Sequence, residues 1–110
     1  MKFATRNLGD HVTVISGEGR LNQVSAPLLR EAVAAAVLEG RPRIVVDLSG
    51  VDFMDSSGLG ALVGCLKTAR QAGGDVKIAA PSEQVTMVLQ LSNLDRIFTS
   101  FATPEDAYRD

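Results

Sequence analysis

The sequence predicts an α/β fold, a single mixed β-sheet of four to five strands packed with about four α-helices. Short β-branched segments, such as "HVTVIS" at His11–Ser16 and "RIVVDLS" at Arg43–Ser49, alternate with longer segments whose apolar residues recur at helical spacing. The chain has 110 residues, of which 45% are hydrophobic and 22% charged. This size and composition are typical of one globular domain, so we expect a single domain over residues 1–110.

Five segments are predicted as strands. A weak strand at Lys2–Asn7 precedes His11–Ser16 across the turn "LGD", and we expect it to be an antiparallel edge. The apolar segment Arg43–Ser49 fits a central strand that is covered on both faces. Asp75–Ala80 is a further clear strand, and Arg96–Phe101 is a short last one. Helices between these strands predict parallel crossover connections.

The first predicted helix has a start signal and a stop signal. Ser25 is expected as its N-cap, and Pro27 falls in the first turn, where a missing N–H costs nothing. A hydrophobic contact between Val24 and Leu29 is expected across this cap. Gly40 suits the position just after the last turn, so the helix should end there.

Three more helices follow by the same reasoning. One starts at "DSSG" and ends at Gly73, and its inward residues are expected to be Leu59, Leu62, Val63 and Leu66. The next covers "SEQVTMVLQLSNL", with Ser82 as cap and Asn93 as a left-handed stop. The last is "TPEDAYR", with Thr103 as cap and Pro104 at the first position.

The charge and cysteine content exclude several classes of protein. The formal net charge is -2, and no basic stripe exists to bind nucleic acid or an anionic membrane. The opening "MKFATRN" lacks the long apolar segment of a signal peptide or membrane span, so the cytoplasm is the expected compartment. The single cysteine, Cys65, lies in an apolar run and is expected to be a buried thiol. No metal or cofactor is expected.

The segment "FMDSSGLGALVG", Phe53–Gly64, has the strongest functional pattern, and four roles are open for its serines. Asp55 or Ser56 could cap the following helix. The glycine spacing could form a phosphate cradle, but it does not match the dinucleotide-binding pattern. A nucleophilic serine would need a base, and His11 is the single histidine in the sequence.

The fourth role is a serine that receives a phosphoryl group. A hydroxyl at a helix N-terminus can carry a phosphate without disturbing the fold, because free N–H groups face it. No Lys or Arg occurs between Arg43 and Lys67, while Asp52 and Asp55 lie beside the serines. We therefore expect the new charge to have no local cation, and to repel a partner that docks on an apolar patch around Phe53 or Met54.

The run "RIVVDLSGVDFMDSSGLGALVGCLKTARQAGGDVKIAAPSEQVTMVLQLSNLDRIF" resembles the STAS domain of bacterial anti-sigma-factor antagonists. The resemblance extends from "HVTVISGEGRLN" to "TPEDA" and is strongest at "VDFMDSSGLG". It implies the STAS fold and a regulatory cycle called partner switching. In this cycle the unmodified protein binds an anti-sigma factor that is also a serine kinase of the GHKL type, and a sigma factor is released.

The resemblance also implies the roles of individual residues. Ser56, directly after the aspartate of the motif, would be the phosphorylation site, and a PP2C-type phosphatase would reverse the modification. The protein would be the substrate and ligand of enzymes, with no catalytic residue of its own, and a monomer is expected. The expected partner-binding residues are Asn22, Phe53, Met54, Asp55, Ser57, Gly58 and Leu59.

One position departs from the family pattern. Many such antagonists have Asp where "GRLN" here ends in Asn22. Asn keeps an acceptor oxygen and the preference for turns but has no charge. If the carboxylate normally meets the kinase, recognition is altered here; otherwise Asn22 terminates the loop.

Two other functions stay open at the level of sequence. One is a STAS adaptor that is not phosphorylated, within a transport or stress-signalling complex, in which "DSSG" is a cap and contact surface. The other is a small serine hydrolase, which requires His11 to approach Ser56 or Ser57.

Overall fold

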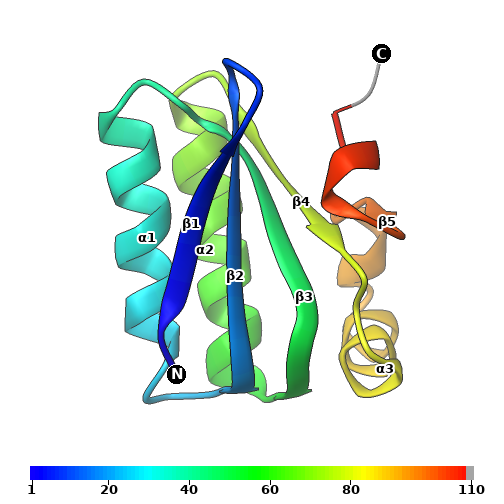
Figure 1. Ribbon diagram of the computed structural model, residues 1–110. Helices are drawn as coiled ribbons and strands as arrows, with labels where there is room; N and C mark the ends of the chain where they lie inside the picture. Colours follow the sequence, from blue (N-terminus) through cyan, green and yellow to red (C-terminus); the bar gives the residue numbers. More distant parts are fainter. Residues whose placement is uncertain (109–110) are drawn as a thin grey trace.

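The computed structural model describes residues 1–108, in which five strands form one mixed sheet beside three α-helices (Figure 1). The strands are β1 (Phe3–Leu8), β2 (Val12–Leu21), β3 (Arg43–Met54), β4 (Asp75–Ala79) and β5 (Ser100–Phe101). The helices are α1 (Ala26–Leu38), α2 (Ser56–Gln71) and α3 (Glu83–Leu91), with 3-10 turns η1 (Leu94–Arg96) and η2 (Pro104–Asp106).

The strand order in the sheet is β1-β2-β3-β4-β5, so β3 is central. β1 pairs antiparallel with β2, and the other neighbouring pairs are parallel. These pairings confirm the antiparallel leading edge and the parallel connections through the three helices. Since β3 is the central strand, the helix that follows it begins at the carboxyl end of the parallel strands, in the middle of the sheet.

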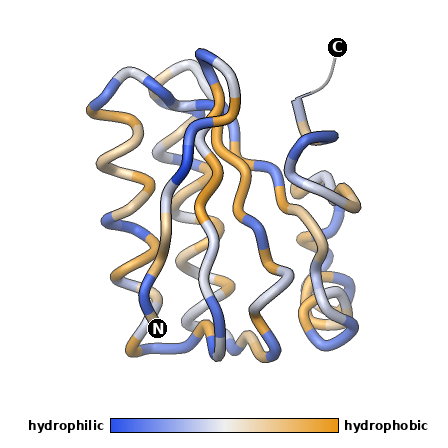
Figure 2. Tube along the Cα trace, viewed as in Figure 1, coloured by the Kyte–Doolittle hydropathy of each residue, from blue (hydrophilic) through white to orange (hydrophobic). Residues whose placement is uncertain are grey.

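The sheet has two differently covered faces. Ile15, Ile44, Val46 and Ile78 belong to the main core, which also contains buried residues of all three helices. α1 and α2 lie side by side against this face (Figure 1). Figure 2 shows hydrophobic stretches in the central strands and in the helices. On the opposite face, a smaller cluster joins strand residues to the C-terminal segment: Val12, Val14, Val45, Ala79 and Ala107.

The two longest strands extend past their predicted ends. The sequence predicted His11–Ser16 and Arg43–Ser49, but β2 continues to Leu21 and β3 to Met54. The glycines of "SGEGR" and "LSGVD" indicate turns when read locally. Here the two segments pair with each other across register shifts, and these ladder bonds keep both chains extended.

The C-terminal region differs most from prediction. The expected strand Arg96–Phe101 is reduced to Ser100–Phe101, because the preceding residues form η1 and direct Phe98 into the core. The expected fourth helix is the single turn η2; its predicted end at Arg109 lies outside the described residues. Three residues cannot repay the cost of starting an α-helix. The Tyr108 hydroxyl instead fastens this segment to β3, accepting from the Ile44 N–H at 3.1 Å.

The helix signals were mostly read correctly. Ser82 caps α3 by accepting from Val85 N–H at 3.2 Å, and Asn93 is left-handed with φ 61°. Gly40 and Gly73 end their helices with positive φ. Thr103 precedes η2 without capping it through its side chain.

Two expectations at helix surfaces were wrong. Val24 is 79% exposed, so it makes no hydrophobic contact across the start of α1 with the buried Leu29. Val63 is 38% exposed on α2, whereas Leu62 and Leu66 are buried as predicted.

Within residues 1–108, no helix combines the length and hydropathy that a membrane crossing requires.

Candidate functional site

The predicted serine segment lies where β3 passes directly into α2. Only Asp55 separates the two elements, and it is the N-cap of the helix. Its Oδ1 accepts from the N–H of Ser57 at 2.9 Å and from the N–H of Gly58 at 3.1 Å. Of the two capping candidates in the sequence, the carboxylate therefore satisfies the free N–H groups, and Ser56 does not.

Gly58 fixes this turn against the end of β2. A Cβ at Gly58 would stand 2.4 Å from the Leu21 carbonyl oxygen and 2.9 Å from Met54 Cγ. No side chain fits in that space, so the glycine permits the close approach of α2 and β2. The Asp55 N–H donates to the same Leu21 oxygen at 3.3 Å, which ties the cap to the neighbouring strand.

The two serine hydroxyls are left unused by the fold. Ser56 is exposed and Ser57 half-buried. Within residues 1–108, neither hydroxyl forms a hydrogen bond to another protein group. Ser57 contributes its backbone N–H to the cap, while Ser56 presents a free hydroxyl at the first position of α2. The Ser56 hydroxyl is thus accessible to groups outside the molecule.

The neighbouring apolar residues divide between surface and core. Met54 is 1% exposed, so the docking patch expected around Phe53 or Met54 does not include the Met54 side chain. The Met54 backbone is paired twice with the Gln84 side chain of α3, at 2.8 and 3.0 Å. Phe53 is half-buried, with the Arg20 guanidinium 5.3 Å from its ring centroid. Leu59 is half-buried against the core.

A groove of about 370 Å³ lies beside the serines and contains a positive charge that the sequence did not predict. It is lined by Gln23, Ala26, Pro27, Arg30, Ser56, Ser57 and Gly60. The sequence suggested that no cation lies near Ser56, because none is close along the chain. The structure brings Arg30 of α1 into the groove, since α1 packs against α2.

The glycines Gly60 and Gly64 explain how Arg30 reaches α2. A Cβ at Gly60 would be 4.0 Å from Arg30 Nη2, and one at Gly64 would be 3.7 Å from Nε. Both glycines therefore face the arginine and not the sheet. They lie within a helix and are covered by a side chain, so the structure gives no support for a glycine-rich phosphate cradle.

The loop before α1 lies next to the serine turn and has internal roles of its own. Asn22 Oδ1 accepts from the N–H of Val24 at 3.0 Å and of Ser25 at 3.3 Å. The Ser25 side chain, expected to cap α1, makes no capping bond. Its Oγ instead donates to the Arg20 carbonyl at 2.7 Å and accepts from the Asn22 N–H at 2.9 Å.

A nucleophilic role for the serines is not supported by the position of His11. His11 precedes β2, whereas the serines adjoin Leu21 at the other end of that strand. At about 3.3 Å per residue, the ten residues of β2 separate the two by about 30 Å.

Cys65 is buried, and burial raises the pKa of its thiol to about 11, with the charge of Arg30 opposing the shift. This thiol stays protonated near neutral pH.

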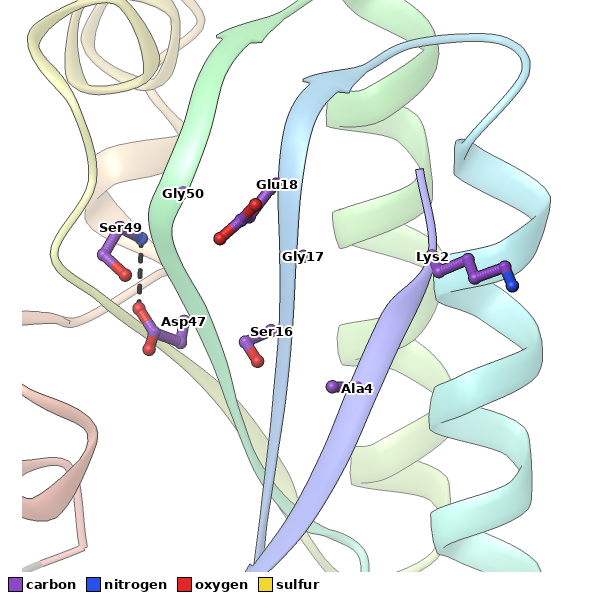
Figure 3. Close-up of a pocket in the computed structure, with 8 residues that line it drawn as sticks. All are labelled: Lys2, Ala4, Ser16, Gly17, Glu18, Asp47, Ser49 and Gly50. Carbon is purple, nitrogen blue, oxygen red and sulfur yellow. Dashed lines mark hydrogen bonds between the residues drawn. The ribbon is translucent and has the colours of Figure 1, made fainter.

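A larger hollow lies elsewhere, on the open part of the second sheet face (Figure 3). It measures about 520 Å³ and is lined by Lys2, Ala4, Ser16, Gly17, Glu18, Asp47, Ser49 and Gly50. Asp47 is engaged there, accepting from the Ser49 N–H at 3.0 Å.

Within residues 1–108 no three His, Cys, Asp or Glu side chains are grouped to hold a metal.

The fold and site together define a class. A mixed sheet is flanked by helices, and the helix after the central strand begins with an aspartate cap and a free serine. Residues 4–107 match the STAS domain, and the chain belongs to that family.

Relatives and solved structures agree with this assignment. The anti-sigma-F factor antagonist RsfB of Mycobacterium tuberculosis is 33% identical over 107 residues, which cover 94% of this chain and 85% of RsfB. The crystal structure of an anti-sigma factor antagonist from Mycobacterium paratuberculosis has a TM-score of 0.82 at 30% identity, covering 96% of this chain and 88% of that one.

SpoIIAA is a similar protein whose structure is known in two forms. Its unphosphorylated form has a TM-score of 0.80 at 27% identity, over 94% of this chain and 90% of that one. The phosphorylated form of SpoIIAA from Bacillus, described as a cell fate determinant, has a TM-score of 0.73 at 26% identity, over 94% of both chains.

Proposed function

We propose that the protein is an anti-sigma-factor antagonist that works by partner switching. In its unmodified form it binds an anti-sigma factor that is a GHKL-type serine kinase, and this binding releases a sigma factor. Phosphorylation of Ser56 ends the binding, and a PP2C-type phosphatase restores it. The antagonist would act in the cytoplasm as a ligand and substrate, and would catalyse no reaction.

The observation that carries this proposal is the free hydroxyl of Ser56 at the start of α2. Asp55 already provides the cap, so the fold does not need the Ser56 side chain. The family match and the names of the relatives favour regulation of an anti-sigma factor. SpoIIAA, which shares the fold, has been solved in a phosphorylated form.

The chemical step is a phosphoryl transfer from ATP. A bond forms between Ser56 Oγ and the γ-phosphorus while the bond from that phosphorus to the bridging oxygen of ATP breaks, and ADP leaves. The hydroxyl proton passes to a base of the kinase. The phosphatase returns the serine with water as the co-reactant, releasing inorganic phosphate.

The docking surface is proposed to surround Ser56. Its expected members are Asn22, Phe53, Asp55, Ser57 and Leu59, with Met54 and Gly58 supporting them from inside. A phosphate adds about -1.5 to -2 charges at the centre of this surface. If desolvating that charge costs the complex about 3–4 kcal/mol, affinity falls by several hundredfold.

The test starts with partner capture from native lysate on wild type and on Ser56→Asp. We expect a GHKL-type kinase on the wild type and its loss on Ser56→Asp. With this kinase and ATP, mass spectrometry should show a gain of about 80 Da, the mass of one phosphoryl group. Ser56→Ala should abolish the gain, whereas Ser57→Ala keeps the Ser56 hydroxyl and should still gain one phosphoryl group, even if the loss of a docking contact slows the reaction.

Three results would contradict the proposal. The first is a phosphate that maps to a residue other than Ser56, and the second is equal kinase binding by wild type and Ser56→Asp. The third is capture of a transporter ATPase in place of the kinase, which would favour the non-phosphorylated adaptor.

A further inference from the structure

We propose that Arg30 is the counter-charge for a phosphate on Ser56, and that the phosphoserine is held in the groove between α1 and α2. The inference rests on the proposed phosphorylation of Ser56 and adds how the modified state is held. It assigns part of the switch to a contact within the protein itself, made by a residue on a helix that the sequence motif does not include.

Ser56, Gly60 and Gly64 share one face of α2. These residues are spaced by four along α2, so they form one row on the helix surface, with neighbouring Cβ positions about 5–6 Å apart. Arg30 lies along this row, its Nε nearest Gly64 and its Nη2 nearest Gly60. The guanidinium therefore points along α2 toward Ser56, and its outer nitrogen is one helical turn away.

The Arg30 side chain is exposed and lies beside the groove. Within residues 1–108 the guanidinium has no hydrogen-bond or ion-pair partner, although it lies against a neighbouring helix. It is also the one charged side chain among the residues that line the groove with Ser56. An unpaired arginine beside a modifiable hydroxyl leaves its donors available for an anion.

A phosphate on Ser56 and the Arg30 guanidinium match in their chemistry and in their reach. A phosphate extends Ser56 by a phosphorus atom and three strong acceptor oxygens. Arginine presents planar paired donors that bind phosphate in a bidentate manner. The absence of side chains at Gly60 and Gly64 leaves the space in which the guanidinium can move toward the phosphate. The carboxylate facing the same turn, Asp55, is already engaged with the helix N–H groups.

The inference predicts a contact that can be measured without the kinase. Phosphoserine is introduced at position 56 during translation, and the second pKa of its phosphate is followed by phosphorus NMR. We expect Arg30→Gln to raise this pKa by about 0.5 unit or more, because a nearby cation favours the dianion. Arg30→Lys should retain part of the effect, since lysine keeps the charge but not the fork.

Arg70→Gln is the matched control. It removes the same charge from α2, but fourteen residues along the helix, about 21 Å from Ser56 at 1.5 Å per residue. The control should leave the phosphate pKa unchanged. The urea unfolding midpoint of each unphosphorylated variant should stay close to that of wild type, which shows that all are folded. This holds for Arg70→Gln as well, because the ion pair with Asp75 that it removes is exposed and contributes little.

An unchanged phosphate pKa in Arg30→Gln would overturn the inference, and so would an equal shift in Arg70→Gln. This outcome is separate from the proposed function. A kinase that fails to modify Ser56 contradicts the proposed function alone, because the encoded phosphoserine tests the groove whether or not a kinase exists.

Discussion

Two turns of this protein contain similar residues and use them in opposite ways. The first turn, residues 22–25, precedes α1 and contains Asn22 and Ser25; the second turn, residues 55–58, precedes α2 and contains Asp55 and Ser56. In the first turn the serine is 2% exposed and its Oγ forms hydrogen bonds with backbone groups of Arg20 and Asn22. In the second, Asp55 makes the backbone bonds and Ser56 is exposed.

The difference separates a serine whose hydroxyl the fold requires from one whose hydroxyl is free for the proposed modification. Both lie just before or at the start of a helix, and sequence propensity favours both as caps. A hydroxyl that already satisfies buried backbone groups cannot be modified without breaking the turn. Ser56 carries no such duty, because the carboxylate before it satisfies the helix start. The comparison can be tested by substitutions in both turns, taken from the largest expected effect.

Gly58→Ala should have the largest effect, since Gly58 holds the second turn against Leu21 at the end of β2. A Cβ would stand 2.4 Å from the Leu21 oxygen, so the strand or helix must shift. We expect a loss of about 2–3 kcal/mol in the free energy of unfolding, measured by urea denaturation. Gly64→Ala is the control: its Cβ has room beside Arg30, and no loss is expected. Equal stability of the two variants would contradict the packing.

Ser25→Ala and Ser56→Ala form the direct test of the comparison. Removing Ser25 Oγ leaves the Arg20 carbonyl and the Asn22 N–H without their partner, at a cost of about 2 kcal/mol. Removing Ser56 Oγ breaks no internal bond and should change stability by less than about 0.5 kcal/mol. Urea denaturation measures both. A large loss in the free energy of unfolding of Ser56→Ala would show that the fold does require the Ser56 hydroxyl.

Asp55→Ala removes the cap of α2. It should cost about 1 kcal/mol, because the N–H groups of Ser57 and Gly58 lose their acceptor. Asp55→Asn keeps an acceptor oxygen and should lose much less. Thermal unfolding followed by circular dichroism compares them. If both variants are as stable as wild type, Asp55 is not the cap that frees Ser56.

Asn22→Asp should have the smallest effect on stability, within about 0.5 kcal/mol, because a carboxylate can accept the same bonds from Val24 and Ser25. It introduces the residue that the family resemblance implies at this position. If Asn22 faces the kinase as proposed, the initial rate of Ser56 phosphorylation should rise severalfold. An unchanged rate, measured with the captured kinase, would restrict Asn22 to the turn.

The sequence by itself determined the alternation of strands and helices, the family, the serine motif and most helix ends. These follow from signals within a few residues of one another: apolar periodicity, caps and left-handed stops such as Asn93. Local reading failed where distant partners overrule it. The glycine-containing ends of β2 and β3 are strands because they pair with each other, and the last predicted helix yields to the hydrogen bonds of Tyr108.

The tertiary structure alone decided the environment of Ser56. Arg30 is twenty-six positions away in the sequence, and it shares a groove with Ser56 only because α1 packs against the glycine face of α2. Burial separated Met54 from Phe53, and hydrogen bonding separated Ser25 from Ser56. Charge, exposure and free hydrogen-bonding capacity depend on what the folded chain brings together, and a pattern of neighbouring letters does not specify that.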